Sequence, residues 1–232
     1  GRTITRLSLQ SKIVLTMTLF LLTLGTLGFY LLEHHNPATM GTLNAAGKFQ
    51  AAFFQSVTTR TAGFASISQS GLTNGSKLLA CLLMIVGGSP AGTAGGIKTT
   101  TVAVLLLTAI SVLRGNKDTE CYGRKITFEI IRVAITITLV TFVFWLFGVT
   151  VMTVIEPQQK VLDLMFEATS AMATVGLTVD LTPVLSDISH VVLMLMMYIG
   201  RIGPMTMALI FSGHVDKKNK FRTLPEAKIM VG

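Results

Sequence analysis

The chain has 232 residues, of which 50% are hydrophobic and only 13% are charged. Soluble domains carry about 25% charged residues, so the composition argues against an ordinary soluble protein. The formal net charge of +8 would suit a nucleic-acid ligand, but the basic residues lie at the ends of long apolar segments, which argues against nucleic acid.

The first long apolar segment is Ile13–Leu32, twenty residues without a charge or a proline. This length is enough to cross a hydrocarbon core of about 30 Å, so we predict a membrane span. A shorter apolar segment follows at 46–58, and its thirteen residues are too few to cross. Its helical spacing of apolar residues predicts a re-entrant helix, which is tolerated where the backbone after it is buried or faces water.

The residues after this short helix are small, carry hydroxyl groups and end in glycine. Glycine adopts backbone angles that are closed to other residues, and the C-terminus of a helix favours a nearby cation. Backbone carbonyl oxygens arranged in this way replace the hydration shell of potassium in a selectivity filter. We therefore predict a first filter segment, which would contact a cation through the carbonyls of Thr61, Ala62, Gly63 and Phe64.

The next apolar segment is interrupted, because GGSPAGTAGGIKTT at 87–100 separates 78–86 from 99–113. Freed backbone groups cannot face lipid, so we predict that residues 87–98, the gate loop, lie in a water-filled path below the filter. A phosphate-binding loop is the poorer reading, since isoleucine precedes the lysine. A plain linker would leave a span that is too short. The expected gating residues of the loop are Gly87, Gly88, Ser89, Gly92, Thr93, Gly95, Gly96 and Lys98.

The second half of the chain repeats this order at an offset of 113 residues. Phe53–Phe64 aligns with Phe166–Leu177, which predicts a second filter segment after a second short helix. The elements expected in this half are a span at 133–155, the short helix at 161–172, the filter residues Thr174, Val175, Gly176 and Leu177, and an interrupted span at 191–199 and 203–212.

Arg201 aligns with Gly88 of the gate loop at the same offset. An arginine at this depth is costly unless it faces water or the interior of the bundle, so we predict that Arg201 and the gate loop form the constriction. A structural ion pair of Arg201 with Glu167 or Glu129 remains the alternative. Arg60, beside the first filter segment, is expected to be a buttress paired with Glu167.

Lysine and arginine are concentrated before the first span, between the second and third spans, and after the fourth, which is the positive-inside pattern. Both termini are therefore expected in the cytoplasm. The units 1–116 and 117–213 would run parallel, with a cytoplasmic tail at 214–232, whereas inverted-repeat carriers have opposed units. The predicted fold is an all-α membrane protein with two parallel span–pore-helix–span repeats, which comprise four transmembrane helices, two re-entrant pore helices and a potassium-channel-like pore.

Four ordered stretches together carry a family resemblance that covers nearly the whole chain: FFQSVTTRTAGF, GGSPAGTAGGIKTT, FEATSAMATVGL and GRIGPMTMAL. They resemble the third and fourth repeats of the Trk/Ktr/HKT potassium-transporter superfamily, closest to the KtrB membrane subunit. That family has four such units around one pore, so the resemblance implies a C-terminal half that needs the remaining two units. It also implies an intramembrane gate loop and an arginine at the place of Arg201.

The resemblance further implies the ligand and the partners. Potassium would be the transported ion in a bacterial cell membrane, and sodium is left open as a coupling ion. The membrane subunit would be a homodimer bound to a cytoplasmic nucleotide-binding ring of the KtrA type, so nucleotide would act only through that partner.

Two other classes of function compete with transport. A non-transporting helix bundle that serves as an anchor is the alternative, although an anchor needs no backbone exposed at membrane depth. An enzyme is not expected, because the chain shows no Ser/His/Asp set, no HExxH and no paired carboxylates. Glu33-His34-His35 is expected to be a solvated turn rather than a metal site, and Cys81 and Cys121 are expected to be unpaired.

Overall fold

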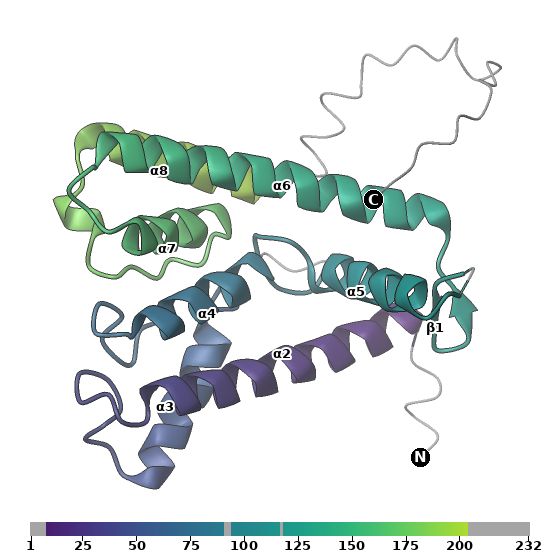
Figure 1. Ribbon diagram of the computed structural model, residues 1–232, viewed down its shortest axis with the longest axis horizontal. Coiled ribbons are helices and arrows are strands. Elements are labelled where there is room, and N and C mark those ends of the chain that lie inside the picture. The colour runs from purple at the N-terminus through teal and green to yellow at the C-terminus, as the bar shows by residue number, and fades with distance from the viewer. Residues whose placement is uncertain (1–7, 91–93, 117, 204–232) are drawn as a thin grey trace.

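The computed structural model describes residues 8–90, 94–116 and 118–203. Two of the expected gate residues, Gly92 and Thr93, lie outside these residues, as do the second part of the last predicted span and the tail. The described chain is mostly helical (Figure 1). Its helices are α2 (Leu9–Glu33), α3 (Ala45–Thr58), α4 (Asn74–Ile85), α5 (Thr99–Leu113), α6 (Phe128–Ile155), α7 (Val161–Met172), the short 3-10 turn η1 (Thr182–Val184) and α8 (Asp187–Ile202).

A small β-hairpin corrects the all-α expectation. It joins β1 (Glu120–Cys121) to β2 (Arg124–Lys125) in the basic connection between the two units. Tyr122 and Gly123 both have positive φ, 50° and 72°, and two such residues in a row make the tight turn that two-residue hairpins favour. This turn was not predicted, because the basic residues of the connection indicated only a charged loop.

The predicted helix positions agree with the described structure except at 200–202. These residues were expected to interrupt the last span, but α8 continues through Ile202 and ends at Gly203. The short helices α3 and α7 occupy the places expected at 46–58 and 161–172, and the break between α4 and α5 coincides with the gate loop. Side chains of Ser8, Asn44, Thr73 and Ser186 accept a hydrogen bond from a backbone N–H in the first turn of the helix that follows. Such N-caps define where these helices begin.

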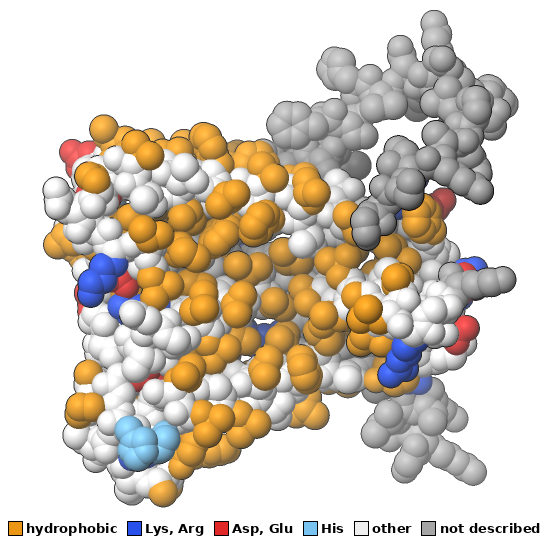
Figure 2. All heavy atoms as spheres, in the orientation of Figure 1, with side chains coloured by type: hydrophobic (Ala, Val, Ile, Leu, Met, Phe, Trp, Pro, Cys, Tyr) orange, Lys and Arg blue, Asp and Glu red, His pale blue; other side chains and the backbone are white. Residues whose placement is uncertain are grey.

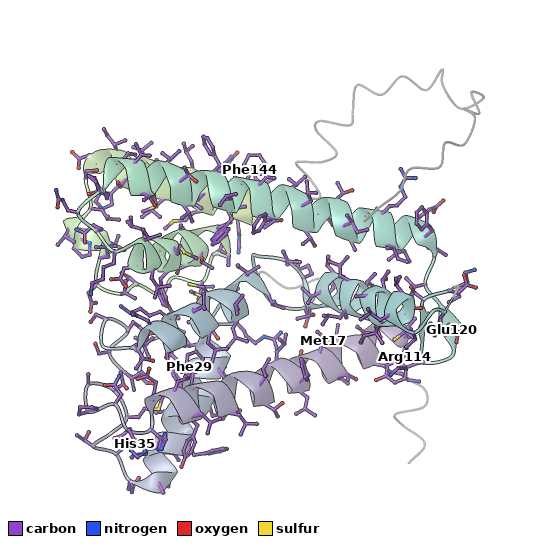
Figure 3. The ribbon with its side chains drawn as sticks, viewed as in Figure 1. Met17, Phe29, His35, Arg114, Glu120 and Phe144 are labelled. Carbon is purple, nitrogen blue, oxygen red and sulfur yellow. The ribbon has the colours of Figure 1, made fainter. Side chains whose placement is uncertain are left out.

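The surface matches a membrane environment. Helices α2 and α6 are each long and apolar enough to cross a membrane, and many of their large apolar side chains are exposed. Hydrophobic side chains cover the middle of the face shown in Figure 2, while most of its charged side chains lie toward the left and right ends. His35 and Arg114 lie at these opposite ends (Figure 3). Exposed apolar area of this extent is costly in water and is stable in lipid.

The two units run in the same direction. Helices α2 and α6 both begin near the β-hairpin and end near the short helices (Figure 1). Helix α7 packs against α4, α6 and α8, whereas α3 packs chiefly against α2. The main core therefore surrounds α7, with Leu164, Phe166 and Met172 buried in it, and α3 lies at the edge of the assembly.

In each unit a carboxylate at the end of the first long helix fastens that helix to the start of α4 or of α8. Glu33 accepts hydrogen bonds from the backbone N–H and hydroxyl of Thr73, at 2.9 and 2.7 Å. Glu156 accepts from the backbone N–H of Ser186 at 2.8 Å. Thr73 and Ser186 are 113 positions apart and both are N-caps, so the repeat predicted from sequence extends to these contacts.

Candidate functional site

The two predicted filter segments share one backbone conformation. Thr61 and Thr174 have φ of 65° and 53°, and Gly63 and Gly176 have φ of 76° and 94°. Positive φ is rare for a threonine, whose β-carbon is branched, so the same left-handed residue at equivalent places in both units is informative. Strained backbone of this kind is concentrated at functional sites. In each segment one residue without positive φ lies between two residues with positive φ. Successive peptide groups therefore differ in orientation along the segment.

The two filter segments meet. A Cβ placed on Gly63 would overlap the carbonyl oxygen of Val175, and one placed on Gly176 would lie 4.0 Å from the Cα of Gly63. The C-terminal residues of the two segments differ in exposure, because the Phe64 side chain is 70% exposed and the equivalent Leu177 only 3%. The second segment is thus enclosed by this chain, and the first lies on its open side.

Polar side chains of the short helices hold the chain that follows each filter segment. The buried Glu167 of α7 accepts hydrogen bonds from Thr178, from the backbone N–H of Val179 at 3.0 Å and from Thr182 at 2.8 Å. In the first unit the buried Gln55 donates to Gln69 at 2.7 Å. These contacts support the filter segments from the side of the short helices.

The expected pairing of Arg60 with Glu167 is wrong. The Arg60 guanidinium donates to the backbone carbonyl of Thr18, on α2, at 3.4 Å, while the Glu167 carboxylate is occupied by its loop. The sequence placed both residues beside the filter but gave no means of choosing their partners.

The gate loop is closed at its neck by backbone hydrogen bonds. The N–H of Gly87 donates to the carbonyl of Ile97 at 2.9 Å, and the N–H of Ile97 donates to that of Ile85 at 3.0 Å. The N–H of Thr99, the first residue of α5, donates to the carbonyl of Gly88 at 3.2 Å. The neck joins the end of α4 to the start of α5, so the break in the span is ordered where the structure describes it.

Glycines let the gate loop pack directly against the second unit. A Cβ on Gly87 would overlap the carbonyl oxygen of Gly95, and one on Gly95 would overlap Thr174 Oγ1. A Cβ on Gly200 of α8 would overlap the carbonyl oxygen of Met172. Close packing at Gly95 and Gly200 therefore brings the gate loop and α8 against the chain that leads into the second filter segment.

Arg201 lies between the gate loop and the second filter segment. It lines a cavity of about 640 Å³ together with Gly95, Gly96 and Lys98, and a second cavity of about 560 Å³ together with Thr174–Leu177. The Lys98 ammonium donates to the carbonyl of Ala94 within the loop at 2.5 Å.

Several interactions near the site were not anticipated from sequence. Lys77 of α4 forms an ion pair of 2.6 Å with Asp163 of α7, which links the two units. Ser70 donates to Asp180 at 2.7 Å and joins the loops that follow the two filter segments. Each pair is far apart in sequence, so no local pattern could have found it, although the placement of Asp163 in the first turn of a helix favours an acid there.

The stretch Glu33-His34-His35 is solvated only in part: His34 and His35 form a turn in which His35 is exposed, as expected, but Glu33 departs from the expectation. Glu33 is fully buried and accepts hydrogen bonds from Asn36 and Thr39 in addition to Thr73. In the part of the chain that the structure describes, no three His, Cys, Asp or Glu side chains are placed to hold a metal ion. Cys81 and Cys121 are buried free thiols.

The exposed apolar helices, with a break between α4 and α5, place the chain in the class of helical membrane proteins. The family model described as "Cation transport protein" (TrkH) matches residues 3–222. The chain belongs to this family of cation transport proteins, as the four sequence stretches indicated.

Individual relatives agree with the family. The chain is 38% identical over 225 residues to the Ktr system potassium uptake protein B of Bacillus subtilis, covering 97% of this chain and 50% of that protein. It is 34% identical over 230 residues to the potassium/sodium uptake protein NtpJ of Enterococcus hirae, covering 98% and 51%. The chain thus spans about half the length of these relatives.

A solved structure supports the fold. The crystal structure of the potassium transporter TrkH from Vibrio parahaemolyticus superimposes with a TM-score of 0.69 at 17% identity, covering 84% of this chain and 43% of that one. At this identity the likeness concerns the fold alone.

Proposed function

We propose that the chain forms half of a pore that takes up potassium across the bacterial cell membrane. In this proposal, potassium is dehydrated by backbone carbonyls of the two filter segments, and the gate loop with Arg201 forms the constriction below them. The carrying observation is the matched backbone: left-handed threonines and positive-φ glycines recur 113 positions apart in segments that touch. A non-transporting anchor gives no reason for this match.

The other two units of the pore are proposed to complete the open side. Helix α7 of the second unit packs against α4 of the first. By the repeat, α3 would pack against the helix equivalent to α4 in a preceding unit. That face of α3 and its filter segment carries large exposed apolar side chains, namely Phe49, Phe53, Phe54, Val57 and Phe64. The half-length match to relatives supports a C-terminal half.

The partners that the family resemblance implies belong to the proposal as well. A Ktr-type system would pair a homodimer of the membrane subunit with a KtrA-type cytoplasmic ring, through which nucleotide acts. The β-hairpin with its flanking basic residues is the proposed cytoplasmic contact surface. Both termini are proposed to be cytoplasmic in a multi-pass topology, and the NtpJ name supports testing sodium as a second ion.

The test is ion flux in liposomes that contain the full-length transporter. Gly63→Ser and Gly176→Ser place a side chain on a positive-φ residue at the junction of the filter segments, so each is expected to lower the ratio of potassium to sodium flux. Gly115→Ser is the matched control, because Gly115 also has positive φ, 71°, and a Cβ there would meet nothing within 4 Å. Equal flux ratios in all four proteins would contradict the filter assignment.

A further inference from the structure

We propose that the contact between Gly95 and Thr174 makes the gate loop part of the support of the second filter segment, so that ion selectivity depends on where the loop lies. The inference rests on the proposed transport function and deepens it. It assigns Gly95 a positioning role for selectivity, whereas a gate alone would only set the rate.

The first step is the closeness of the contact. A Cβ on Gly95 would overlap Thr174 Oγ1 and would lie 2.7 Å from the carbonyl oxygen of Ala173 and 2.9 Å from Thr174 Cγ2. Real Cβ atoms essentially never approach within 3.0 Å of another heavy atom. Gly95 is buried and its φ is outside the left-handed region, so close approach, not backbone conformation, is what excludes a side chain.

The second step concerns what holds Thr174 in its unusual conformation. From the side of α7, its N–H donates to the carbonyl of Ala171 at 3.0 Å. The next two N–H groups, of Val175 and Gly176, donate to the carbonyl and hydroxyl of Ser170 at 2.9 and 3.1 Å. The hydroxyl and methyl of Thr174 face the gate loop instead. The left-handed residue is therefore held between the pore helix on one side and Gly95 on the other.

The third step is the connection from Gly95 to the neck of the gate loop and to α4. Gly87 packs on the carbonyl oxygen of Gly95, and the hydrogen bonds between Gly87, Ile97 and Ile85 fix this stretch to the end of α4. A displacement of α5 or of the neck cannot leave Gly95 in place. Because the field of a carbonyl filter depends on the placement of its oxygens, movement of the loop would alter the filter and not only unblock it.

The experiment measures potassium and sodium flux in liposomes with the full-length transporter and its Gly95→Ala variant. The added methyl group pushes on Thr174, and the ratio of the two fluxes is expected to change by about fivefold, within the range of coupling between contacting residues. Gly75→Ala adds the same methyl group in α4, where its nearest neighbour, Leu32 Cδ2, would lie at 3.4 Å, an ordinary contact. It is expected to leave the ratio as it is.

A double variant identifies the contact responsible. Thr174→Ala removes both side-chain atoms that the new methyl group would strike, so Gly95→Ala is expected to have a much smaller effect on the ratio in that background. Additive effects of the two substitutions would overturn the proposal. If Gly95→Ala does not fold, Thr174→Ser, which removes the Cγ2 facing the loop, is compared with Thr61→Ser, and equal ratios for the two would overturn it.

The outcomes separate this inference from the function on which it rests. No potassium flux through the unaltered protein would refute the transport proposal itself. Potassium flux with Gly95→Ala scaling both ions by one factor would leave transport standing and refute the role of the loop in selectivity.

Discussion

The ion pair between Lys77 and Asp163 offers a sharp test of how the two units are held together. Their side chains are 9% and 20% exposed and 2.6 Å apart. Lys77→Met leaves the Asp163 carboxylate without its cation, and breaking a buried pair costs about 3–5 kcal/mol. The first turn of α7 itself stabilises an acid by about 0.3–1 kcal/mol, and Asp163 keeps some contact with solvent. We therefore expect a loss of about 2–3 kcal/mol.

The assay is thermal unfolding of the purified full-length protein in detergent. A change of 1 kcal/mol moves Tm by about 2–4 °C in a domain of 150–250 residues and by less in a longer chain. A decrease in Tm of about 4–8 °C is therefore expected for Lys77→Met. Asp163→Asn added to this variant removes the unpaired charge and should restore part of the decrease.

A second ion pair in the same chain supplies the control. Lys125 and Asp118 are also 2.6 Å apart, but they are 61% and 48% exposed. Exposed pairs contribute about 0–1 kcal/mol, so Lys125→Met should lower Tm by only a small amount. Equal decreases for Lys77→Met and Lys125→Met would refute the reasoning, because burial would then not determine the strength of the contact between units.

Three further predictions concern the gate loop, Arg201 and Glu156. Deleting two or three residues within 88–96 should raise potassium flux in liposomes, and lower flux through folded protein would argue against a gate. Arg201→Ala should raise the conduction rate, because a positive charge in the path opposes a cation; a wild-type rate would remove Arg201 from the barrier. Hydrogen bonds from Ser186 and Ser189 lower the pKa of Glu156 below its ordinary 4.5, so its stabilising contribution is complete above that pH and is lost as pH falls through the lowered pKa. The Tm difference between the wild type and Glu156→Gln should therefore narrow as pH falls below 4.5, and a constant difference would exclude this linkage.

The sequence located the helices because their signals are local. An uncharged run such as Ile13–Leu32 must be helical at membrane depth. A glycine-rich stretch such as 87–96 interrupts a helix. The filter segments were found for the same reason, since glycine after a short helix marks a change of backbone direction, and the structure has positive φ at Gly63 and Gly176. Their roles in transport remain predictions.

The contacts that depend on the arrangement of helices could not be found in this way. Lys77 and Asp163 are two of several scattered charges in the sequence, and only the packing of α4 on α7 brings them together. Glu33 was expected to be solvated because it lies at the end of a predicted span, yet its carboxylate is buried by residues up to 40 positions away. Arg60 was expected to pair with Glu167 because both are close to a filter segment in the sequence. Its partner is instead the carbonyl of Thr18 on α2.

The connection after α2 is ten residues longer than the one after α6, since 40 positions separate Glu33 from Thr73 and 30 separate Glu156 from Ser186. Most of the extra length lies at 34–44, between α2 and α3, where Thr42 and Leu43 are exposed. This place is therefore a natural site for an epitope insertion. Antibody binding to such a tag on intact cells would report the orientation of the protein while leaving its packed interior unchanged.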